Sequence, residues 1–277
     1  MTRLVLEKVT RRFGGLVAVD DVSFAVPEQG VTAVIGPNGA GKTTLFSLIS
    51  GFLPPSAGRV LFEGADITGL SPERVAARGL VRTFQLAKLF EDLTAQENVQ
   101  VGRHLHTRGG LFGALLRPPA TRRAEREVEE KARELLGFVG LHGQADMPAA
   151  GLSYGQQRLL EMARALATEP RLVLLDEPAA GLNGEESAAL SRIIRRIADQ
   201  GTTVLLIEHD MTLVMNTADR LVVMDFGRKI AEGTPEQMRR DPAVIAAYLG
   251  SAPTPGRPIA ADRVAIGSGN MEGALHG

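Results

Sequence analysis

The stretch Gly36-Pro37-Asn38-Gly39-Ala40-Gly41-Lys42-Thr43-Thr44 decides how this chain folds. It matches the pattern G-x-x-x-x-G-K-[ST], in which glycines let backbone N–H groups turn inward around the phosphates of a nucleotide. An apolar run, Val31–Ile35, precedes the stretch, and a helical run, Thr44–Ser50, follows it. A strand, a glycine-rich loop and a helix in this order predict a phosphate-binding loop at the edge of a sheet.

A second segment predicts the chemistry that accompanies this loop. The apolar strand Leu172–Leu175 ends in Asp176-Glu177-Pro178. Asp176 is expected to hold Mg²⁺, directly or through water, and Glu177 to orient and deprotonate an attacking water. Pro178 disfavours the right-handed helical region for the residue before it. With Lys42 reaching the β- and γ-phosphates and the Thr43 hydroxyl binding Mg²⁺, the two segments together predict nucleotide hydrolysis.

The composition excludes several other classes of protein. The 277 residues include 31 Lys+Arg and 32 Asp+Glu, a formal net charge of −1, which disfavours a dedicated nucleic-acid binder. The absence of cysteine rules out disulfides, thiolate metal sites and cysteine nucleophiles. The first residues carry charges where a signal peptide needs an apolar run, and the apolar stretches have the length of strands. We therefore expect a soluble, cytosolic chain, which could still dock onto a membrane protein.

The pattern of apolar residues divides the chain. Short strands and turns fill the first 65 residues, and strands alternate with helices after residue 151, which predicts a parallel sheet with helices packed against it. Between them, apolar residues of 122–141 recur with the helical period. Capping patterns predict that helices begin at Ser71, Thr94 and Ser153. The end, 251–277, is rich in Ala, Gly and Pro and is expected to be a disordered tail.

The segment Leu152-Ser153-Tyr154-Gly155-Gln156-Gln157 resembles the signature motif of ATP-binding cassette ATPases, the nucleotide-binding subunits of ABC transporters. The resemblance extends over about residues 4–250. It implies an α/β fold, the P-loop NTPase ABC cassette, with a RecA-like mixed sheet core, an antiparallel β element and an inserted α-helical subdomain. On this basis 1–250 form the ABC ATPase domain, with its core in 1–85 and 166–250 and the helical subdomain in 86–165.

The resemblance also implies how the signature is used. Two cassettes pair head-to-tail in this family, so Ser153, Gly155 and Gln156 are expected to contact the ATP held by the other cassette. The third signature residue is usually glycine and here is Tyr154, which leaves the backbone donors in place and gives a side chain able to pack against a neighbour. Asn183 stands where aspartate is common, and it also suits the start of a helix.

Three more residues receive roles from the resemblance. Gln85, in Thr83-Phe84-Gln85, occupies the position that senses the γ-phosphate and Mg²⁺. His209 follows the strand Val204–Ile207, where the family has a switch histidine that contacts the γ-phosphate. Phe13 stands where the family carries an aromatic that stacks on adenine, and a small core aromatic is the less favoured alternative.

The expected site is therefore an ATPase site. The catalytic residues are Glu177, His209 and Gln85, and the Mg²⁺ site comprises Thr43, Gln85 and Asp176. The residues expected to bind ATP are Phe13, Gly36, Pro37, Asn38, Gly39, Ala40, Gly41, Lys42, Thr43, Thr44, Ser153, Gly155 and Gln156. A DNA-repair ATPase would need a long coiled coil between Gln85 and Ser153, and a translation factor would carry two phosphate loops, so neither class fits.

Shorter likenesses favour one subgroup, the ATP-binding subunits of bacterial branched-chain amino acid importers. They are Gly51-Phe52, Arg82-Thr83-Phe84-Gln85, Leu89-Phe90, Leu93-Thr94, Glu97-Asn98-Val99, Ala179-Ala180-Gly181-Leu182-Asn183 and Glu208-His209-Asp210-Met211. Importers of urea or short amides and a lipopolysaccharide-export ATPase are also similar. The subgroup implies two transmembrane permease subunits, a second cassette that is identical or related, and a periplasmic substrate-binding protein. It implies a peripheral position at the cytoplasmic face of the inner membrane.

Overall fold

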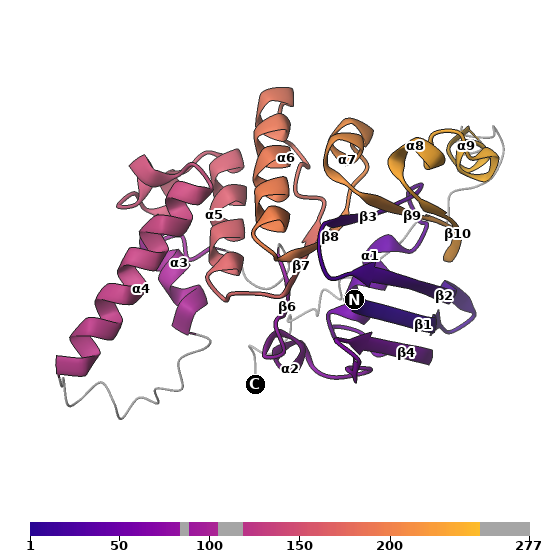
Figure 1. The fold of residues 1–277 in the computed structure, drawn as a ribbon, viewed down its shortest axis with the longest axis horizontal. Coiled ribbons are helices and arrows are strands. Elements are labelled where there is room, and N and C mark those ends of the chain that lie inside the picture. The colour runs from indigo at the N-terminus through magenta and orange to yellow at the C-terminus, as the bar shows by residue number, and fades with distance from the viewer. Residues whose placement is uncertain (84–88, 105–118, 250–277) are drawn as a thin grey trace, which may run out of the picture.

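The computed structural model describes residues 1–83, 89–104 and 119–249 (Figure 1). Gln85, and the tail 251–277 for which disorder is expected, lie outside these residues. The strands are β1 Thr2–Phe13, β2 Leu16–Pro27, β3 Val31–Ile35, β4 Ala57–Phe62, β5 Ala65–Asp66, β6 Leu80–Arg82, β7 Leu172–Asp176, β8 Thr203–Ile207, β9 Arg220–Asp225 and β10 Arg228–Gly233. The helices are α1 Lys42–Ile49, α2 Pro72–Ala76, α3 Ala95–His104, α4 Pro119–Phe138, α5 Tyr154–Leu166, α6 Gly184–Asp199, α7 Met211–Thr217, α8 Pro235–Met238 and α9 Pro242–Leu249.

The central sheet has six strands in the order β10-β9-β3-β8-β7-β6. All neighbouring pairs are parallel except β10 with β9, which closes one edge as an antiparallel hairpin. A second sheet, β2-β1-β4-β5, is antiparallel. The expected α/β class, with a mixed sheet core and an antiparallel β element, is therefore confirmed.

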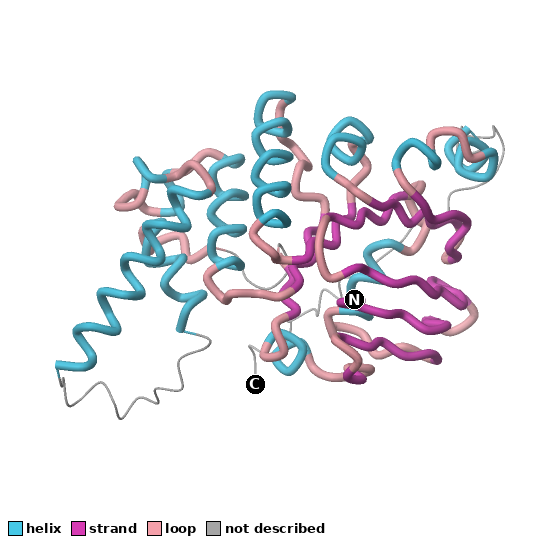
Figure 2. Tube along the Cα trace, in the orientation of Figure 1, coloured by secondary structure: helices cyan, strands magenta, loops and turns pink. Residues whose placement is uncertain are grey.

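The central strands are apolar on both faces because both faces are covered. Along β8, Val204 and Leu206 join one buried cluster, whereas Leu205 and Ile207 join the other. The first cluster includes residues of α5, α6 and α7, and the second includes residues of α1, β1 and β2. Alternate side chains of a strand point to opposite faces, so the central sheet is sandwiched between helices and the antiparallel sheet (Figures 1 and 2).

The structure confirms the predicted helix starts. Ser71 precedes α2, the side chain of Glu97 accepts from the backbone N–H of Thr94 at the start of α3, and Ser153 caps α5. On α4 the predicted apolar face is buried through Ala132, Leu135 and Leu136. Three strands were not predicted, β5, β6 and β10. β5 has only two residues, β6 has three and ends in a buried arginine, and β10 is mostly polar.

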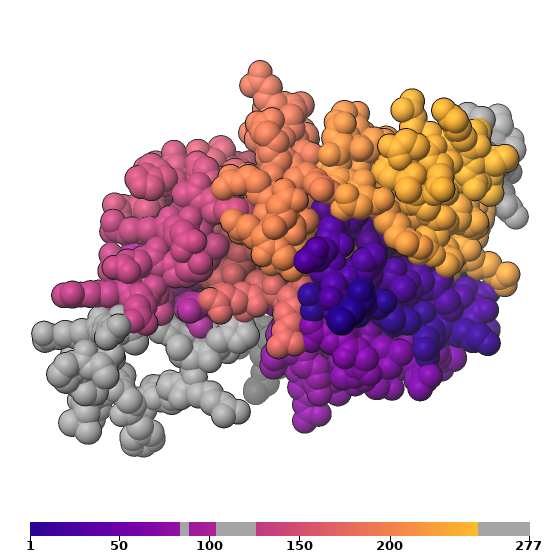
Figure 3. All heavy atoms as spheres, viewed as in Figure 1, coloured from indigo at the N-terminus to yellow at the C-terminus, as the bar shows by residue number. Residues whose placement is uncertain are grey.

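Helices α3, α4 and α5 form a group at one end of the molecule, away from the antiparallel sheet (Figures 1 and 2). On the face drawn in Figure 3, the N-terminal part of the chain (indigo) and the last described part (yellow) lie side by side at the end opposite this helical group. The ion pair between Arg228 and Asp20 joins them there, with Nη2 of Arg228 2.6 Å from Oδ2 of Asp20. Within the described residues, no helix is both long enough and apolar enough to cross a membrane.

Candidate functional site

Three neighbouring parallel strands bring the predicted residues to one edge of the central sheet. The phosphate loop follows β3, Asp176 ends β7 with Glu177 directly after it, and His209 follows β8, which lies between the other two strands. Parallel strands end at the same edge, and ligands of open α/β sheets bind at the carboxyl ends of the strands. Segments that are more than 130 positions apart in the sequence therefore surround one cavity of about 450 Å³, lined by the loop and by Glu177.

The phosphate loop leads directly into α1. Gly41 precedes the helix with φ +94°, and a Cβ atom at this position would lie 2.3 Å from the carbonyl oxygen of Ala18. Only glycine fits both the conformation and this close approach. No side chain caps the helix, so its first N–H groups stay available for an anion.

Lys42 lies inside the loop in this structure. Its Nζ atom donates hydrogen bonds to the carbonyl oxygens of Gly36, at 2.7 Å, and Pro37, at 3.0 Å. Burial lowers the pKa of Lys42, and the negative charges of Glu177 and Asp176 partly offset that shift. A phosphate anion in the loop would act against the effect of burial and raise the pKa of Lys42, because it favours the charged ammonium.

Asp176 is held by an arginine that is completely buried. Nη2 of Arg82 lies 2.5 Å from Oδ2 of Asp176, and the other terminal nitrogen, Nη1, donates to the hydroxyls of Ser47 and Ser50 on α1. The guanidinium also lies 6.0 Å from the ring centroid of Phe46. Arg82 therefore connects the end of β6, the predicted Mg²⁺ carboxylate and the helix that follows the phosphate loop.

Glu177 has an unusual backbone conformation at the edge of the site. Its φ of +48° is uncommon for a residue other than glycine, and its backbone N–H donates to the carbonyl oxygen of Ile207 at 3.0 Å. The carboxylate is half-exposed to the cavity, and Nδ1 of His209 lies 4.0 Å from Oε1 of Glu177. The structure thus brings the predicted general base and the predicted switch histidine together.

Glu208 is a residue that sequence reasoning assigned no role of its own. Its side chain is completely buried, and Oε1 accepts a hydrogen bond from the backbone N–H of Ala179 at 2.8 Å. Oε2 accepts from the backbone N–H groups of His209, at 2.9 Å, and Asp210, at 3.2 Å. This carboxylate ties the turn after Glu177 to the segment that carries the switch histidine. A glutamate directly after an apolar strand was the only signal for it.

The signature residues lie at the start of α5. The Ser153 hydroxyl accepts from the N–H of Gln156 at 3.3 Å, and the Gln156 side chain accepts from the N–H of Ser153 at 3.0 Å, so the predicted capping box is confirmed. Gly155 is buried beside Glu186, whereas the ring of Tyr154 packs over Gly181. None of the signature residues lines the cavity of the phosphate loop in the same chain.

Tyr154 also binds a neighbour on its own helix. Arg158 donates to the Tyr154 hydroxyl through Nη2 at 2.6 Å, and its guanidinium lies 5.0 Å from the ring centroid. Within the chain, the bulky signature residue thus connects α5 with the turn before α6. Asn183 caps α6, accepting from the N–H groups of Glu185 and Glu186 at 3.0 Å each.

Phe13 lies apart from the other predicted ligands. It ends β1, is 42% exposed and does not line the cavity, and the guanidinium of Arg11 lies 4.6 Å from its ring centroid. The aromatic residue that does line the cavity is Phe226, in the turn between β9 and β10. Sequence reasoning missed it, because that hairpin was not predicted.

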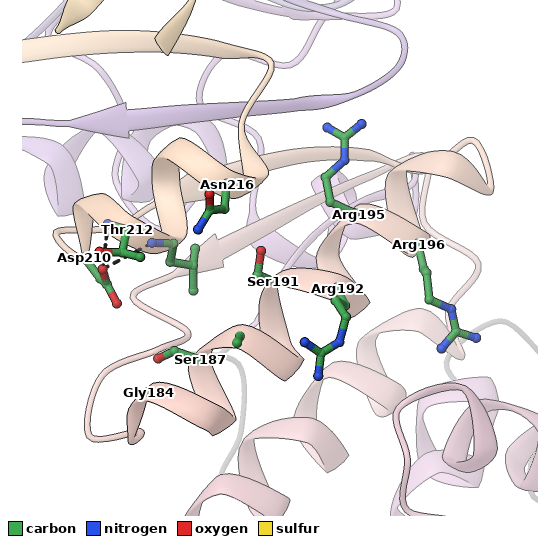
Figure 4. Close-up of a pocket in the computed structure, with 11 residues that line it drawn as sticks. Gly184, Ser187, Ser191, Arg192, Arg195, Arg196, Asp210, Thr212 and Asn216 are labelled. Carbon is green, nitrogen blue, oxygen red and sulfur yellow. Dashed lines mark hydrogen bonds between the residues drawn. The ribbon is translucent and has the colours of Figure 1, made fainter. Parts of the chain in front are cut away.

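A larger cavity of about 700 Å³ lies between α6 and α7 (Figure 4). Arg192, Arg195 and Arg196 project in different directions from α6 and do not converge on a common point (Figure 4). Asp210, which caps α7, also lines this cavity. No residue expected to bind ATP or to act in hydrolysis lines this cavity, so the phosphate-loop cavity is the better candidate site.

Comparison with protein families gives two matches. The family model described as ABC transporter matches residues 19–180, which contain the phosphate loop, the signature and the Asp176-Glu177 pair. A second model, described as branched-chain amino acid ATP-binding cassette transporter, matches residues 228–253.

Individual relatives agree with these matches. The high-affinity branched-chain amino acid transport ATP-binding protein BraF of Pseudomonas aeruginosa is 48% identical over 91% of this chain and 100% of its own length. The protein LivG of Escherichia coli, of the same description, is 46% identical over 87% of this chain and 95% of its own. The crystal structure of an ATP-binding cassette of an ABC transporter in its ADP conformation is 36% identical, with a TM-score of 0.79, over 90% of this chain and 99% of its own. Since the family model covers more than half of the chain and these relatives extend over most of it, the chain belongs to the ABC transporter family, as an ATP-binding subunit.

Proposed function

We propose that this subunit binds ATP with Mg²⁺, hydrolyses it with Glu177 as the general base, and thereby powers the uptake of branched-chain or other hydrophobic amino acids. The observation that carries the proposal is that the phosphate loop and Glu177 line one cavity at the carboxyl ends of the central strands, with His209 beside Glu177. The half-exposed carboxylate of Glu177 suits a base that must reach a water molecule next to the γ-phosphate.

The residues at this edge fit a magnesium ion. The Thr43 hydroxyl and the Asp176 carboxylate are hard oxygen donors, and Mg²⁺ usually combines one or two such groups with waters and substrate phosphates. One bond to Arg82 does not exhaust the acceptor capacity of the Asp176 carboxylate. Bound Mg²⁺ would supply charge neutralisation at the β- and γ-phosphates. Gln85, the third expected ligand, lies outside the described residues.

The chain's own residues account for the other steps of hydrolysis. Lys42, now bonded to loop carbonyls, would turn to the β- and γ-phosphates. Glu177 accepts the proton of the attacking water, and His209 holds the γ-phosphate end of the substrate. Phosphate contacts that exist only when Ser153, Gly155 and Gln156 of a second cassette close over the nucleotide would shift the population toward a closed pair. Loss of the γ-phosphate then reopens the pair.

The relatives' names support the branched-chain amino acid assignment over urea, short-amide or lipid-export systems. In this proposal the chain sits at the cytoplasmic face of the inner membrane, bound to two permease subunits and paired with an identical or related cassette. A periplasmic substrate-binding protein delivers the cargo on the opposite side.

The test has two parts. Glu177→Gln should bind ATP and lose turnover by about 100- to 10,000-fold, as expected for removal of a general base, whereas Lys42→Ala should weaken ATP binding itself. Wild-type turnover of Glu177→Gln would disprove the base assignment. The chain should also co-purify with permease subunits, and leucine-loaded binding protein should stimulate ATP hydrolysis by that complex. Recovery with a lipid exporter instead would disprove the transport assignment.

A further inference from the structure

Two carboxylates lie at the end of β7, and two cations of the same chain compensate their charge. Nη2 of Arg82 lies 2.5 Å from Oδ2 of Asp176. Burial lowers the pKa of Lys42, and Glu177 and Asp176 oppose that shift because both carboxylates lie near the ammonium. Two carboxylates, one guanidinium and one ammonium together carry a formal charge of zero before a nucleotide binds.

Arg82 is the fixed member of this group of charges. Its side chain is completely buried, and Nη1 donates to the hydroxyls of Ser47, at 3.2 Å, and Ser50, at 3.4 Å. These bonds hold the guanidinium against Asp176, and an arginine stays charged throughout the physiological pH range. Lys42 differs, because it must leave the loop carbonyls to reach the phosphates of a nucleotide.

Stability alone is a poor explanation for an arginine at this position. A buried ion pair often stabilises a protein less than apolar residues of the same volume would. The Nε atom of Arg82 is also buried and has no hydrogen-bond acceptor among the described residues, which is costly. The arginine therefore points to a role for its charge at the site.

The carboxylates at this sheet edge do not form a metal site by themselves. Within residues 1–83, 89–104 and 119–249, no group of three or more His, Cys, Asp or Glu side chains could hold a metal ion. The nearby carboxylate of Glu208 is completely buried and accepts from three backbone N–H groups. Mg²⁺ is usually held by one or two carboxylates together with waters and substrate phosphates. A metal at Asp176 therefore depends on oxygens that a nucleotide supplies.

We propose that the buried charge of Arg82 keeps divalent cations from binding at Asp176 until a nucleotide supplies its phosphates. With Arg82 in place, the site carries no net charge to attract a cation, and Oδ2 of Asp176 already has a partner. The triphosphate adds negative charge, so metal and nucleotide enter together. The inference rests on the proposed function and adds the residue that makes metal binding depend on the nucleotide.

The test is a titration of the full chain with Mn²⁺ in the absence of nucleotide. Mn²⁺ prefers the same oxygen ligands as Mg²⁺, and its free form is measured by electron paramagnetic resonance. Arg82→Gln should bind Mn²⁺ at least about 10-fold more tightly than the wild-type chain, which is the effect of removing a unit charge roughly 6 Å from a divalent ion in a water-like dielectric. Adding Asp176→Asn to this variant should abolish the gain.

Two control variants separate charge from packing and from position. Arg82→Lys keeps the charge but loses the planar fork that pairs with the serines, so its stability should fall while its Mn²⁺ affinity stays within about 3-fold of the wild-type value. Arg171→Gln removes the same charge at the other end of β7, roughly 16 Å from Asp176, where Arg171 pairs with Glu63. It should leave the Mn²⁺ affinity unchanged.

Thermal unfolding gives a second readout that involves neither nucleotide nor activity. Mg²⁺ at ten times its dissociation constant for Arg82→Gln should raise the unfolding midpoint of that variant by about 3–5 °C. The same concentration should raise the midpoint of the wild-type chain by no more than about 1–2 °C. If Arg82→Gln does not fold, Lys42→Gln removes the other cation and should bind Mn²⁺ more tightly for the same reason.

The inference is wrong if the variant that lacks the cation binds Mn²⁺ no more tightly than the wild-type chain, or if Arg82→Lys gains as much affinity as Arg82→Gln. In either case the proposed function stands as long as Glu177→Gln binds ATP and loses turnover. A wild-type chain that binds no ATP, with or without Mg²⁺, would overturn the proposed function and this inference together.

Discussion

Arg82 and Asp176 form an ion pair that is almost completely shielded from water. Removal of both charges from water is costly, and the pair is compensated by the additional bonds from Arg82 to Ser47 and Ser50. The arginine thus neutralises the carboxylate that is proposed to face Mg²⁺, and it fixes the distance between β7 and α1.

Arg82→Met should therefore lower the free energy of unfolding by about 3–5 kcal/mol, because Asp176 is left as an unpaired buried charge. The double variant Arg82→Met with Asp176→Asn should recover most of this loss. Urea denaturation measures both. A double variant no more stable than the single one would show that packing of the arginine, and not its charge, is what stabilises this region.

Glu208 is a second buried charged residue, and it directly follows the neighbouring strand β8. Its two oxygens serve three backbone N–H groups, and a glutamine could serve only those that face its single carbonyl oxygen. Glu208→Gln should therefore cost about 1–3 kcal/mol of stability, and displacement of His209 should lower single-turnover hydrolysis by up to about 100-fold.

The matched control for Glu208→Gln is Glu232→Gln, at a partly exposed ion pair with Arg220 and Lys229, where the expected loss is below about 1 kcal/mol. If Glu208→Gln lost stability while hydrolysis and ATP affinity stayed at wild-type values, Glu208 would be a purely structural residue.

At the scale of elements, α5 begins with a capping box whose two side chains satisfy each other. The helix start therefore serves stability in the isolated chain and, by the proposed function, contacts a phosphate in the paired state. The same capping pattern occurs at α8, where Thr234 and Gln237 form the box. The two helices offer an internal comparison.

Ser153→Ala and Thr234→Ala should each lower stability by about 1 kcal/mol, the usual cost of losing a capping side chain. Only Ser153→Ala should also slow ATP hydrolysis by the assembled transporter, because α8 lies away from the proposed phosphate contact. Denaturation curves and steady-state turnover measure the two effects. Equal turnover in both variants would disprove the role of Ser153 in the signature.

For the whole molecule, nucleotide binding should raise the free energy of unfolding, because the ligand binds the folded chain and not the unfolded one. In the Glu177→Gln variant, ATP at about 100 times its dissociation constant should add about 2.7 kcal/mol of stability. This corresponds to a rise of about 5–10 °C in the unfolding midpoint of a chain of this size. Lys42→Ala under the same conditions should show a much smaller shift, and an equal shift would place ATP elsewhere on the molecule.

The position of helices α3, α4 and α5 also bears on how the whole molecule completes its site. The ends of β3, β7 and β8 carry the phosphate loop, Glu177 and His209, whereas the signature residues sit on α5, next to α3 and α4. Within one chain the signature faces no phosphate-loop cavity. A second cassette is the partner that the proposed function requires to complete the site.

Local sequence patterns were enough to predict the parts of this protein that depend on neighbours along the chain. The phosphate loop at 36–44, the capping boxes of Thr94 and Ser153, and the strand that ends at Asp176 all follow from local turn, cap and periodicity rules. The family resemblance then predicted the fold of the whole cassette. Glu177 was predicted as the general base from its place at the end of an apolar strand, and His209 received its role from the resemblance.

The distant residues that complete the site are brought together by long-range contacts of the folded chain. Arg82, Glu208 and Phe226 are inconspicuous in the sequence, since an arginine, a glutamate and a phenylalanine beside apolar runs are ordinary. Their importance arises when β6 pairs with β7, when the turn after Glu177 reaches Glu208, and when the β9–β10 turn contacts the phosphate loop. Strand order and turn position are set by long-range packing, which no local rule encodes, and so these contacts could be read only from the folded chain.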